Sequence, residues 1–165
     1  MPAAIQTPGE RRASAVSPVY CIEQTAKDVN MTETMQQFIL IIDDSITIRK
    51  ILEVTTRRAG YASIGFPDSM EALRWLSASA ERIPALMFVD LSLPKLNGFK
   101  VIQRLKDCRR LSQTPIVIIS SRDGVLDRLK GRLAGADDYL TKPFTTRQIS
   151  AVMQARLAQP TGGAG

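Results

Sequence analysis

The feature that most constrains this chain is a series of short, uninterrupted apolar segments, each followed by a segment with helical spacing. The three strongest segments are about strand length and lie at Phe38–Ile42, Ala85–Val89 and Ile116–Ile119. Strands that are apolar on both faces are typical of the centre of a parallel sheet covered by helices on each side. Two further segments, Tyr61–Phe66 and Asp138–Thr141, mix polar and apolar residues and therefore predict edge strands.

The segments between and after these strands predict amphipathic helices, because apolar residues recur there at three- and four-residue spacing. Capping pairs mark two helix starts, Asp68 with Glu71 and Thr145 with Gln148, and Gly60 marks the end of the first helix. A strand followed by a helix, five times over, predicts an α/β fold with right-handed crossovers. Three central and two edge strands suit a flavodoxin-like (βα)5 doubly wound parallel sheet with strand order 2-1-3-4-5.

The predicted fourth helix combines an apolar stripe with glycine. Leu126, Leu129 and Leu133 form the stripe, and Gly124 and Gly131 lie in the same segment. An interior glycine costs about 1 kcal/mol relative to alanine, so we expect this helix to be marginally stable.

The predicted domain occupies residues 38–158. Residues 1–37 contain proline and scattered polar residues without a sustained apolar period, which predicts a disordered leader. Residues 159–165 predict a flexible tail. Because order begins only at residue 38, Met31 and Met35 are alternative translation starts.

Composition excludes several classes of protein. The chain has no histidine, which removes the usual general base and the commonest zinc ligand. Cys21 and Cys108 are interpreted as two unpaired, reduced thiols of a cytoplasmic protein. No apolar run approaches the ~20 residues that a membrane span needs, and no secretory signal is present. We therefore expect cytoplasmic localisation without membrane insertion.

Three carboxylates follow two of the central strands. Asp43 and Asp44 come directly after the first predicted strand, and Asp90 after the third. The carboxyl ends of parallel strands open on one edge of the sheet, so the three acids are expected to converge beside the topological switch point. Like charges placed so close together call for a cation. Carboxylate oxygens favour a hard divalent ion, and the sequence therefore predicts an Mg²⁺ site.

The same edge is predicted to carry a hydroxyl and an ammonium group. Ser120 and Ser121 follow the fourth strand, and Lys142 follows the fifth. Phosphoryl transfer depends mainly on positioning and charge neutralisation, which a hydroxyl and an ammonium beside Mg²⁺ supply. Each residue alone has an ordinary explanation as a helix cap or a solvated charge. Their joint placement at the ends of four strands indicates phosphoryl chemistry.

These residues and their spacing closely resemble the receiver domain of two-component response regulators, the family of the chemotaxis response regulator. The motifs that carry the resemblance are Ile42-Asp43-Asp44-Ser45, Val89-Asp90, Leu93-Pro94, Asn97-Gly98, Ile119-Ser120-Ser121 and Lys142-Pro143-Phe144. Residues 121–132 and 139–144 look more narrowly like the stand-alone response regulators of type IV pilus twitching motility.

The resemblance implies a phosphorylated aspartate and a metal site. Asp90 would be the phosphoacceptor, receiving its phosphoryl group from a phosphohistidine on a chemotaxis-type histidine sensor kinase. Asp44 and Asp90 would bind Mg²⁺ directly together with the backbone carbonyl of Ser92. Asp43 would act through water. Receivers of this family are switches and not enzymes, apart from their self-catalysed phosphotransfer and dephosphorylation.

The resemblance also implies the parts of a switch. Ser120 would bond a phosphoryl oxygen, Lys142 would pair with the phosphoryl group or with unmodified Asp90, and Tyr139 occupies the aromatic switch position. The Lys142-Pro143 peptide would be cis. Ser92 and Arg122 occupy positions that modulate hydrolysis of the acyl phosphate in the family. The resemblance therefore does not imply a particular lifetime for the phosphorylated state.

The chain carries a formal net charge of +6, but its basic residues are spread over several helices and no recognition helix follows the receiver. A charged helix face is usually solvated, so we expect no DNA binding. Arg128 and Arg132 lie one turn apart on the predicted fourth helix. The fourth helix, fifth strand and fifth helix form the face that receivers commonly use for output. We expect these arginines to dock an acidic downstream protein, with the receiver acting as a monomer.

Two alternatives remain open. The first is a degenerate receiver that acts only as a partner-binding module. The second is a Mg²⁺-dependent phosphohydrolase with Asp90 or Asp43 as nucleophile. The adjacent acids Asp43-Asp44 disfavour the second alternative, because the haloacid-dehalogenase-type phosphatases carry Asp-x-Asp.

Overall fold

The computed structural model describes residues 37–94 and 96–157. The strands are β1 (Phe38–Ile42), β2 (Ala62–Phe66), β3 (Leu86–Asp90), β4 (Ile116–Ser120) and β5 (Asp138–Thr141). The helices are α1 (Ile46–Arg58), α2 (Ser69–Ala78), α3 (Gly98–Asp107), α4 (Val125–Leu133) and α5 (Thr146–Leu157). The predicted leader and tail, with Cys21, Met31 and Met35, lie outside the described residues apart from Gln37. Among the helices described, none has the length and apolar character needed to cross a membrane.

The five strands form one parallel sheet in the order β2-β1-β3-β4-β5, as predicted. β1, β3 and β4 are buried along their whole length, whereas β2 and β5 at the edges are only partly buried. The difference between uninterrupted apolar segments and segments that mix polar and apolar residues therefore predicted the central and edge strands correctly. Central strands are apolar throughout because a helix layer covers both of their faces.

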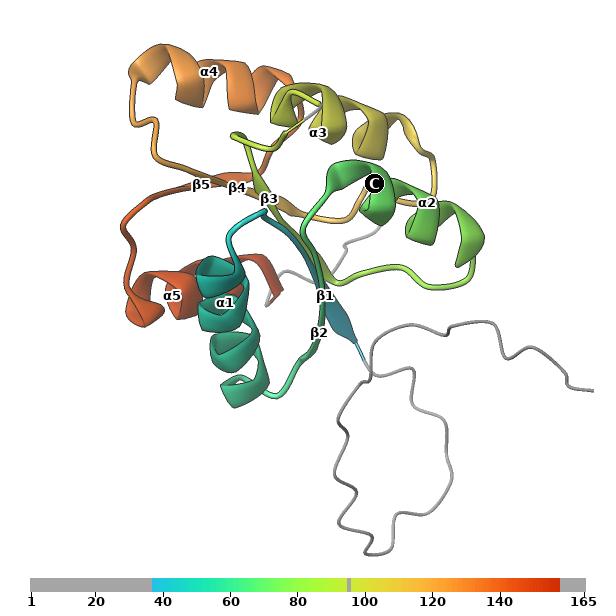
Figure 1. Ribbon diagram of the computed structural model, residues 1–165, viewed down its shortest axis with the longest axis horizontal. Helices are drawn as coiled ribbons and strands as arrows, with labels where there is room; N and C mark the ends of the chain where they lie inside the picture. The colour runs from blue at the N-terminus through green and yellow to red at the C-terminus, as the bar shows by residue number, and fades with distance from the viewer. Residues whose placement is uncertain (1–36, 95, 158–165) are drawn as a thin grey trace, which may run out of the picture. The chain divides into compact units, whose positions relative to one another are not determined.

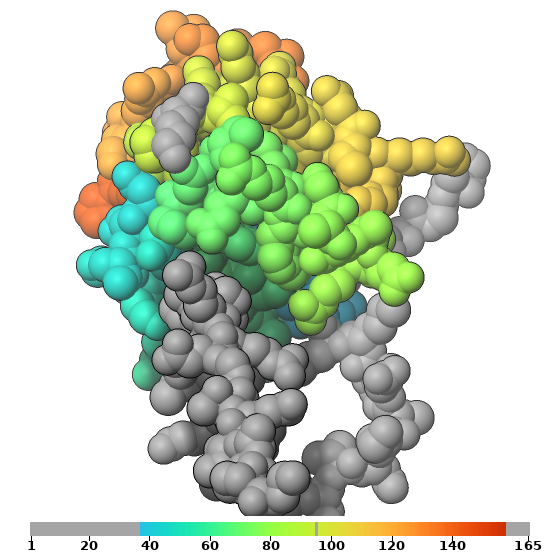
Figure 2. All heavy atoms as spheres, turned by 45° about the vertical axis from the view of Figure 1, so that its right-hand side comes forward, coloured from blue at the N-terminus to red at the C-terminus, as the bar shows by residue number. Residues whose placement is uncertain are grey.

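Two layers of helices enclose the sheet (Figure 1): α2, α3 and α4 cover one face, and α1 and α5 cover the other. Alternate residues of each strand supply the two cores, so Leu40 and Ile42 pack under α2 and α3 while Ile39 and Ile41 pack under α1 and α5. On the first face, α2 adjoins the segment that follows α3 (Figure 2), where Arg110 donates to the carbonyls of Ser79 and Ala80.

Local sequence signals set several helix ends. The side chain of Ser45 caps α1 by accepting from the Ile48 N–H at 3.4 Å. Gly60 follows the end of α1 with φ of +87°, a left-handed conformation that only glycine adopts at little cost. The predicted capping box at α5 is confirmed: the Thr145 N–H donates to Gln148 Oε1 at 2.8 Å, and the Gln148 N–H donates to Thr145 Oγ1 at 3.3 Å.

β3 and β4 each extend one residue further than the apolar pattern predicted, so Asp90 and Ser120 are their last residues. The reason is the neighbouring strand: Asp90 pairs with Ile119 in the ladder, and Ser120 pairs with Thr141. Both residues are therefore held in place by strand pairing and do not lie in a loop.

α4 differs from its expected packing. Gly124 is the N-cap and not a helical residue, and Gly131 is the single buried residue of this helix. The leucine stripe is exposed, at 70% for Leu126, 51% for Leu129 and 76% for Leu133. A Cβ added at Gly131 would lie 2.6 Å from the Cδ1 atom of Ile118. The helix thus approaches the sheet through a glycine and leaves its leucines outside.

Candidate functional site

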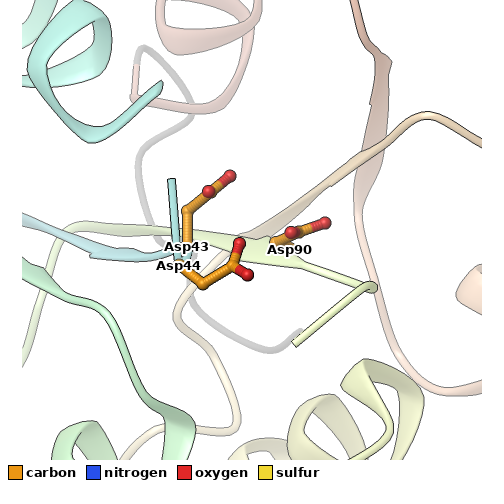
Figure 3. A group of neighbouring side chains, drawn as sticks. All are labelled: Asp43, Asp44 and Asp90. Atoms are coloured by element: carbon orange, nitrogen blue, oxygen red, sulfur yellow. The ribbon is translucent and has the colours of Figure 1, made fainter. Parts of the chain in front are cut away.

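The three predicted acids meet at the carboxyl edge of the sheet. Ile42 pairs with Val89 in the ladder, which places the next residues, Asp43 and Asp90, side by side. One carboxylate oxygen of each of Asp43, Asp44 and Asp90 lies within 4.8 Å of those of the other two. Figure 3 shows the three side chains grouped at the ends of β1 and β3. The predicted convergence of the acids is confirmed.

Lys142 bridges the two buried acids. Its Nζ lies 2.8 Å from Asp43 Oδ2 and 3.3 Å from Asp90 Oδ2. Asp43 is 0% exposed and Asp90 is 2% exposed, so these interactions occur away from bulk water. The peptide between Lys142 and Pro143 is cis, as the resemblance implied. The Lys142 N–H also donates to the Ser120 carbonyl at 2.7 Å, which joins the ends of β4 and β5.

Burial and charge shift the protonation of this pair. Burial raises the pKa of Asp43, and the hydrogen bonds from Lys142 and the Ser45 N–H only partly oppose that effect. Burial lowers the pKa of Lys142, but the hydrogen bond to Asp43 and the charges of Asp90 and Asp43 outweigh it, so this pKa is raised overall. Lys142 therefore stays an ammonium group at neutral pH.

Backbone N–H groups orient the two buried carboxylates. The Ser45 N–H donates to Asp43 Oδ1 at 2.8 Å, and the Ser92 N–H donates to Asp90 Oδ1 at 3.1 Å. Asp44, in contrast, is exposed, and none of the described residues donates to its carboxylate. The site thus has two fixed carboxylates and one that is open toward solvent.

Within the described residues, the three carboxylates and the ammonium of Lys142, which pairs with two of them, leave the site with a net negative charge. Oxygen donors with an excess negative charge suit a hard divalent cation that keeps part of its water shell. Asp43, Asp44 and Asp90 could hold such an ion, and the open carboxylate of Asp44 leaves it an approach from solvent.

Ser120 and Tyr139 are linked through one residue of the loop after β4. The Arg122 N–H donates to Ser120 Oγ at 3.0 Å, and the Tyr139 hydroxyl donates to the Arg122 carbonyl at 2.5 Å. Ser120 is fully buried at the end of β4, while Tyr139 is half-buried on β5. A movement of the Ser120 hydroxyl can therefore reach the tyrosine through two hydrogen bonds.

Sequence reasoning missed Arg49. Its Nη1 atom donates to the carbonyls of Asp43 at 2.7 Å and Asp44 at 3.1 Å, which ties the acid-bearing loop to α1. A cation near the N-terminal end of a helix opposes the helix dipole and is therefore unexpected there. This unfavourable position is the feature of the sequence that could have pointed to Arg49. Gly65 on β2 leaves room for this side chain, because an added Cβ would lie 3.3 Å from Arg49 Cδ.

Gly98 is the second residue that supports the site. A Cβ there would lie 2.6 Å from Leu91 Cα and 2.7 Å from the Asp90 carbonyl oxygen. Only glycine lets α3 begin so close to the backbone of the acid on β3. The Asn97-Gly98 motif was recognised in the sequence, but this reason for the glycine is visible only in the structure.

Arg128 and Arg132, the predicted partner-binding residues, lie on α4 beside β5. They line a cavity of about 310 Å³ with Tyr139 and Arg156. This cavity does not include the three acids. The structure therefore separates a carboxylate site at the strand ends from an arginine-rich surface on the neighbouring helix.

The sequence profile described as the response regulator receiver domain matches residues 39–154. The chain belongs to the response regulator receiver family.

Known relatives agree with this assignment. The chain is 34% identical over 119 residues to protein PilG from Pseudomonas aeruginosa, a match covering 72% of this chain and 86% of PilG. It is 37% identical over 123 residues to the alkaline phosphatase synthesis transcriptional regulatory protein PhoP from Bacillus subtilis, covering 74% of this chain but only 49% of PhoP. The chain thus spans about half the length of PhoP.

Solved structures show the same fold. The chemotaxis protein CheY4 of Vibrio cholerae superposes with a TM-score of 0.67 at 25% identity, covering 74% of this chain and 99% of CheY4. The flavodoxin-like sheet and the resemblance to receivers are therefore confirmed. This chain is therefore a receiver domain by fold and by sequence family.

Proposed function

We propose that this receiver belongs to a response regulator in which Asp90 accepts a phosphoryl group from the phosphohistidine of a sensor kinase, with Mg²⁺ as cofactor. The observation that carries the proposal is the convergence of Asp43, Asp44 and Asp90 at the strand ends, where the ammonium of Lys142 pairs with Asp43 and Asp90. We place the protein in the cytoplasm, as a monomer with residues 38–158 as the signalling domain.

The hydrogen bonds of the two buried acids favour Asp90 over Asp43 as the acceptor. Both Asp43 oxygens have partners at 2.8 Å, the Ser45 N–H on one and Lys142 on the other. The partners of Asp90 are more distant, with the Ser92 N–H at 3.1 Å and Lys142 at 3.3 Å. Asp90 is thus the less tightly held of the two nucleophiles.

The reaction exchanges one phosphorus bond for another. A carboxylate oxygen of Asp90 attacks the phosphorus, and a P–O bond forms as the P–N bond to the kinase histidine breaks. The electron pair leaves on the imidazole nitrogen, which takes up a proton. Lys142 neutralises negative charge on the transferred group, and the Ser120 hydroxyl is the donor for one of its oxygens. Water later attacks the acyl phosphate and restores the carboxylate with release of inorganic phosphate.

Asp44 and Asp90 would hold Mg²⁺ directly with the backbone carbonyl of Ser92, and Asp43 would hold it through water. When bound, the ion supplies neutralisation of the phosphoryl oxygens. The net negative charge of the described part of the site supports this assignment, since Lys142 pairs with the two buried carboxylates and the exposed carboxylate adds a further negative charge.

Output is proposed to occur by protein–protein contact at α4, β5 and α5. The exposed residues Val125 and Leu129 lie beside Arg128 and Arg132 on α4, which suits a partner that is acidic and partly apolar. Similarity to PilG supports a role in pilus-based twitching motility or chemotaxis-like signalling, downstream of a chemotaxis-type kinase.

Intact mass after incubation with acetyl phosphate tests the proposal. We expect one added phosphoryl group in the wild type with Mg²⁺, and none in the wild type with EDTA. Asp90→Ala should show no adduct under either condition. Beryllofluoride binding, followed by ¹⁹F NMR of the bound fluoride, covers the case in which hydrolysis outpaces the mass measurement.

Two results would replace the proposal. Absence of both an adduct and beryllofluoride binding would assign a degenerate receiver that only binds a partner. Turnover of a small phosphate ester that depends on Asp90 or Asp43 would assign a phosphohydrolase.

A further inference from the structure

The guanidinium of Arg128 contacts β5, although the residue as a whole is exposed. Its Cζ lies 4.9 Å from the centroid of the Tyr139 ring, and its Nη2 donates to Thr141 Oγ1 at 2.9 Å. Tyr139 and Thr141 are two residues apart on one strand and so project to the same face of the sheet. One side chain of α4 therefore spans two side chains of β5.

The ring that Arg128 covers is the one linked to the loop after Ser120. The Tyr139 hydroxyl donates to the Arg122 carbonyl at 2.5 Å, and the Arg122 N–H donates to Ser120 Oγ at 3.0 Å. The position of the ring and the conformation of this loop are thus coupled. Any group that holds the ring also holds the loop.

The remaining surroundings of the ring hold it only in part. The backbone of α4 lies against it at Gly131, where an added Cβ would be 3.7 Å from Tyr139 Cδ2. The ring also borders the cavity of about 310 Å³ between α4 and β5. Without the guanidinium, the ring would have space on the cavity side into which it could move.

We propose that Arg128 is a positioning residue that, anchored by Thr141, holds Tyr139 in the place where its hydroxyl bonds the Arg122 carbonyl. The inference rests on the proposed switching function and names a residue that sets its equilibrium. A cation over an exposed aromatic ring biases a two-state equilibrium by roughly two- to fivefold. Arg128 thereby tunes the population of the two states and leaves the chemistry of Asp90 to the strand ends.

Arg132 provides a matched comparison on the same helix. It lines the same cavity, yet no hydrogen bond, ion pair or ring contact of its side chain occurs within the part of the chain that the structure describes. The two arginines carry the same charge one turn apart. Only Arg128 is expected to control the tyrosine.

Fluorine NMR of the full chain labelled with 3-fluorotyrosine measures the ring directly. The chain has three tyrosines, and Tyr139→Phe identifies the resonance of Tyr139 by its loss. The difference in its chemical shift between H₂O and D₂O reports how far the ring is exposed to solvent. Spectra are recorded with and without Mg²⁺ and beryllofluoride.

Arg128→Gln and Thr141→Val should each increase the solvent-induced shift of the Tyr139 resonance, by moving the population of the exposed ring roughly two- to fivefold. Arg132→Gln should leave the resonance at its wild-type position. Thr141→Ser keeps the hydroxyl anchor and should also resemble the wild type. Circular dichroism confirms that each variant is folded before its spectrum is interpreted.

An unchanged Tyr139 resonance in Arg128→Gln would overturn the inference, and so would an equal change in Arg132→Gln. A Thr141→Ser spectrum like that of Thr141→Val would overturn the anchoring role of the hydroxyl. Failure of the proposed function would be recognised separately, because the wild-type protein would then neither gain a phosphoryl group nor respond to beryllofluoride. The effect of Arg128→Gln on the ring in the absence of ligand does not depend on that result.

Discussion

The carboxylate of Asp44 has a different role from those of Asp43 and Asp90. The two buried acids are held by backbone N–H groups and by Lys142, whereas Asp44 is exposed and has no donor among the described residues. Its negative charge repels the other two carboxylates, and no side chain among the described residues pairs with the Asp44 carboxylate. In the absence of a cation, Asp44 is therefore expected to lower stability.

Asp44→Asn should raise the thermal unfolding midpoint in EDTA, because it removes this repulsion without disturbing a hydrogen bond. The same variant should bind Mg²⁺ about tenfold more weakly or worse, because it removes a charged ligand. Differential scanning fluorimetry over an Mg²⁺ titration measures both effects, since a ligand that binds the folded state raises its stability.

Asp107→Asn is the matched control, because it removes the same charge from an exposed residue at the end of α3. It should leave the Mg²⁺ dependence of the midpoint unchanged. Wild-type Mg²⁺ affinity in Asp44→Asn would show that this carboxylate does not bind the ion.

At the scale of elements, the start of α3 determines how closely a helix can approach the strand that carries Asp90. The Asn97 side chain caps this helix by accepting from the Phe99 N–H at 3.0 Å, and Gly98 lies directly against the backbone of Asp90 and Leu91. The contact involves backbone atoms, so a larger residue cannot be accommodated by a change of rotamer.

Gly98→Ala is expected to destabilise the domain by about 2–3 kcal/mol, the upper part of the range for overpacking. It should also reduce acetyl phosphate labelling, because relief of the contact displaces Asp90. Asn97→Ala removes only the cap and should cost about 1 kcal/mol with labelling retained. Urea unfolding together with intact mass measures both quantities, and equal behaviour of the two variants would contradict the steric explanation.

α4 shows where an element can be predicted and its packing cannot. The helical spacing of Leu126, Leu129 and Leu133 predicted the helix correctly, since periodicity is a local property of the sequence. The same spacing suggests a buried face, yet these leucines are exposed. The close approach of Gly131 to Ile118 decides which side of the helix meets the sheet, and no local signal in α4 reports the position of Ile118.

At the scale of the whole molecule, the sheet joins two hydrophobic cores that share its strands. Leu52 on α1 belongs to one core and Leu105 on α3 to the other, and both are at most 1% exposed. Because successive residues of each central strand face opposite cores, neither core can be lost while the sheet remains intact. The two helix layers are therefore expected to unfold together.

Leu52→Ala and Leu105→Ala should each lower the free energy of unfolding by about 2–5 kcal/mol. The fluorescence of Trp75, which packs against Phe38 and Phe66 on the α2 side, should follow the same transition as far-UV circular dichroism in both variants. Separate transitions in Leu52→Ala, whose cavity lies on the opposite face, would contradict the cooperative description.

The βα alternation, the central and edge strands, and the convergence of Asp43, Asp44 and Asp90 could all be predicted from the sequence, because hydrophobic period and strand-end position are local properties. A parallel sheet brings residues at the ends of its strands together at one edge. The tertiary structure alone decided that Lys142, which was expected to pair with Asp90, lies closer to Asp43, and that the arginine at position 128 lies over Tyr139. These contacts join residues distant in the chain. Their distances depend on how each helix is seated on the sheet, which local spacing does not specify.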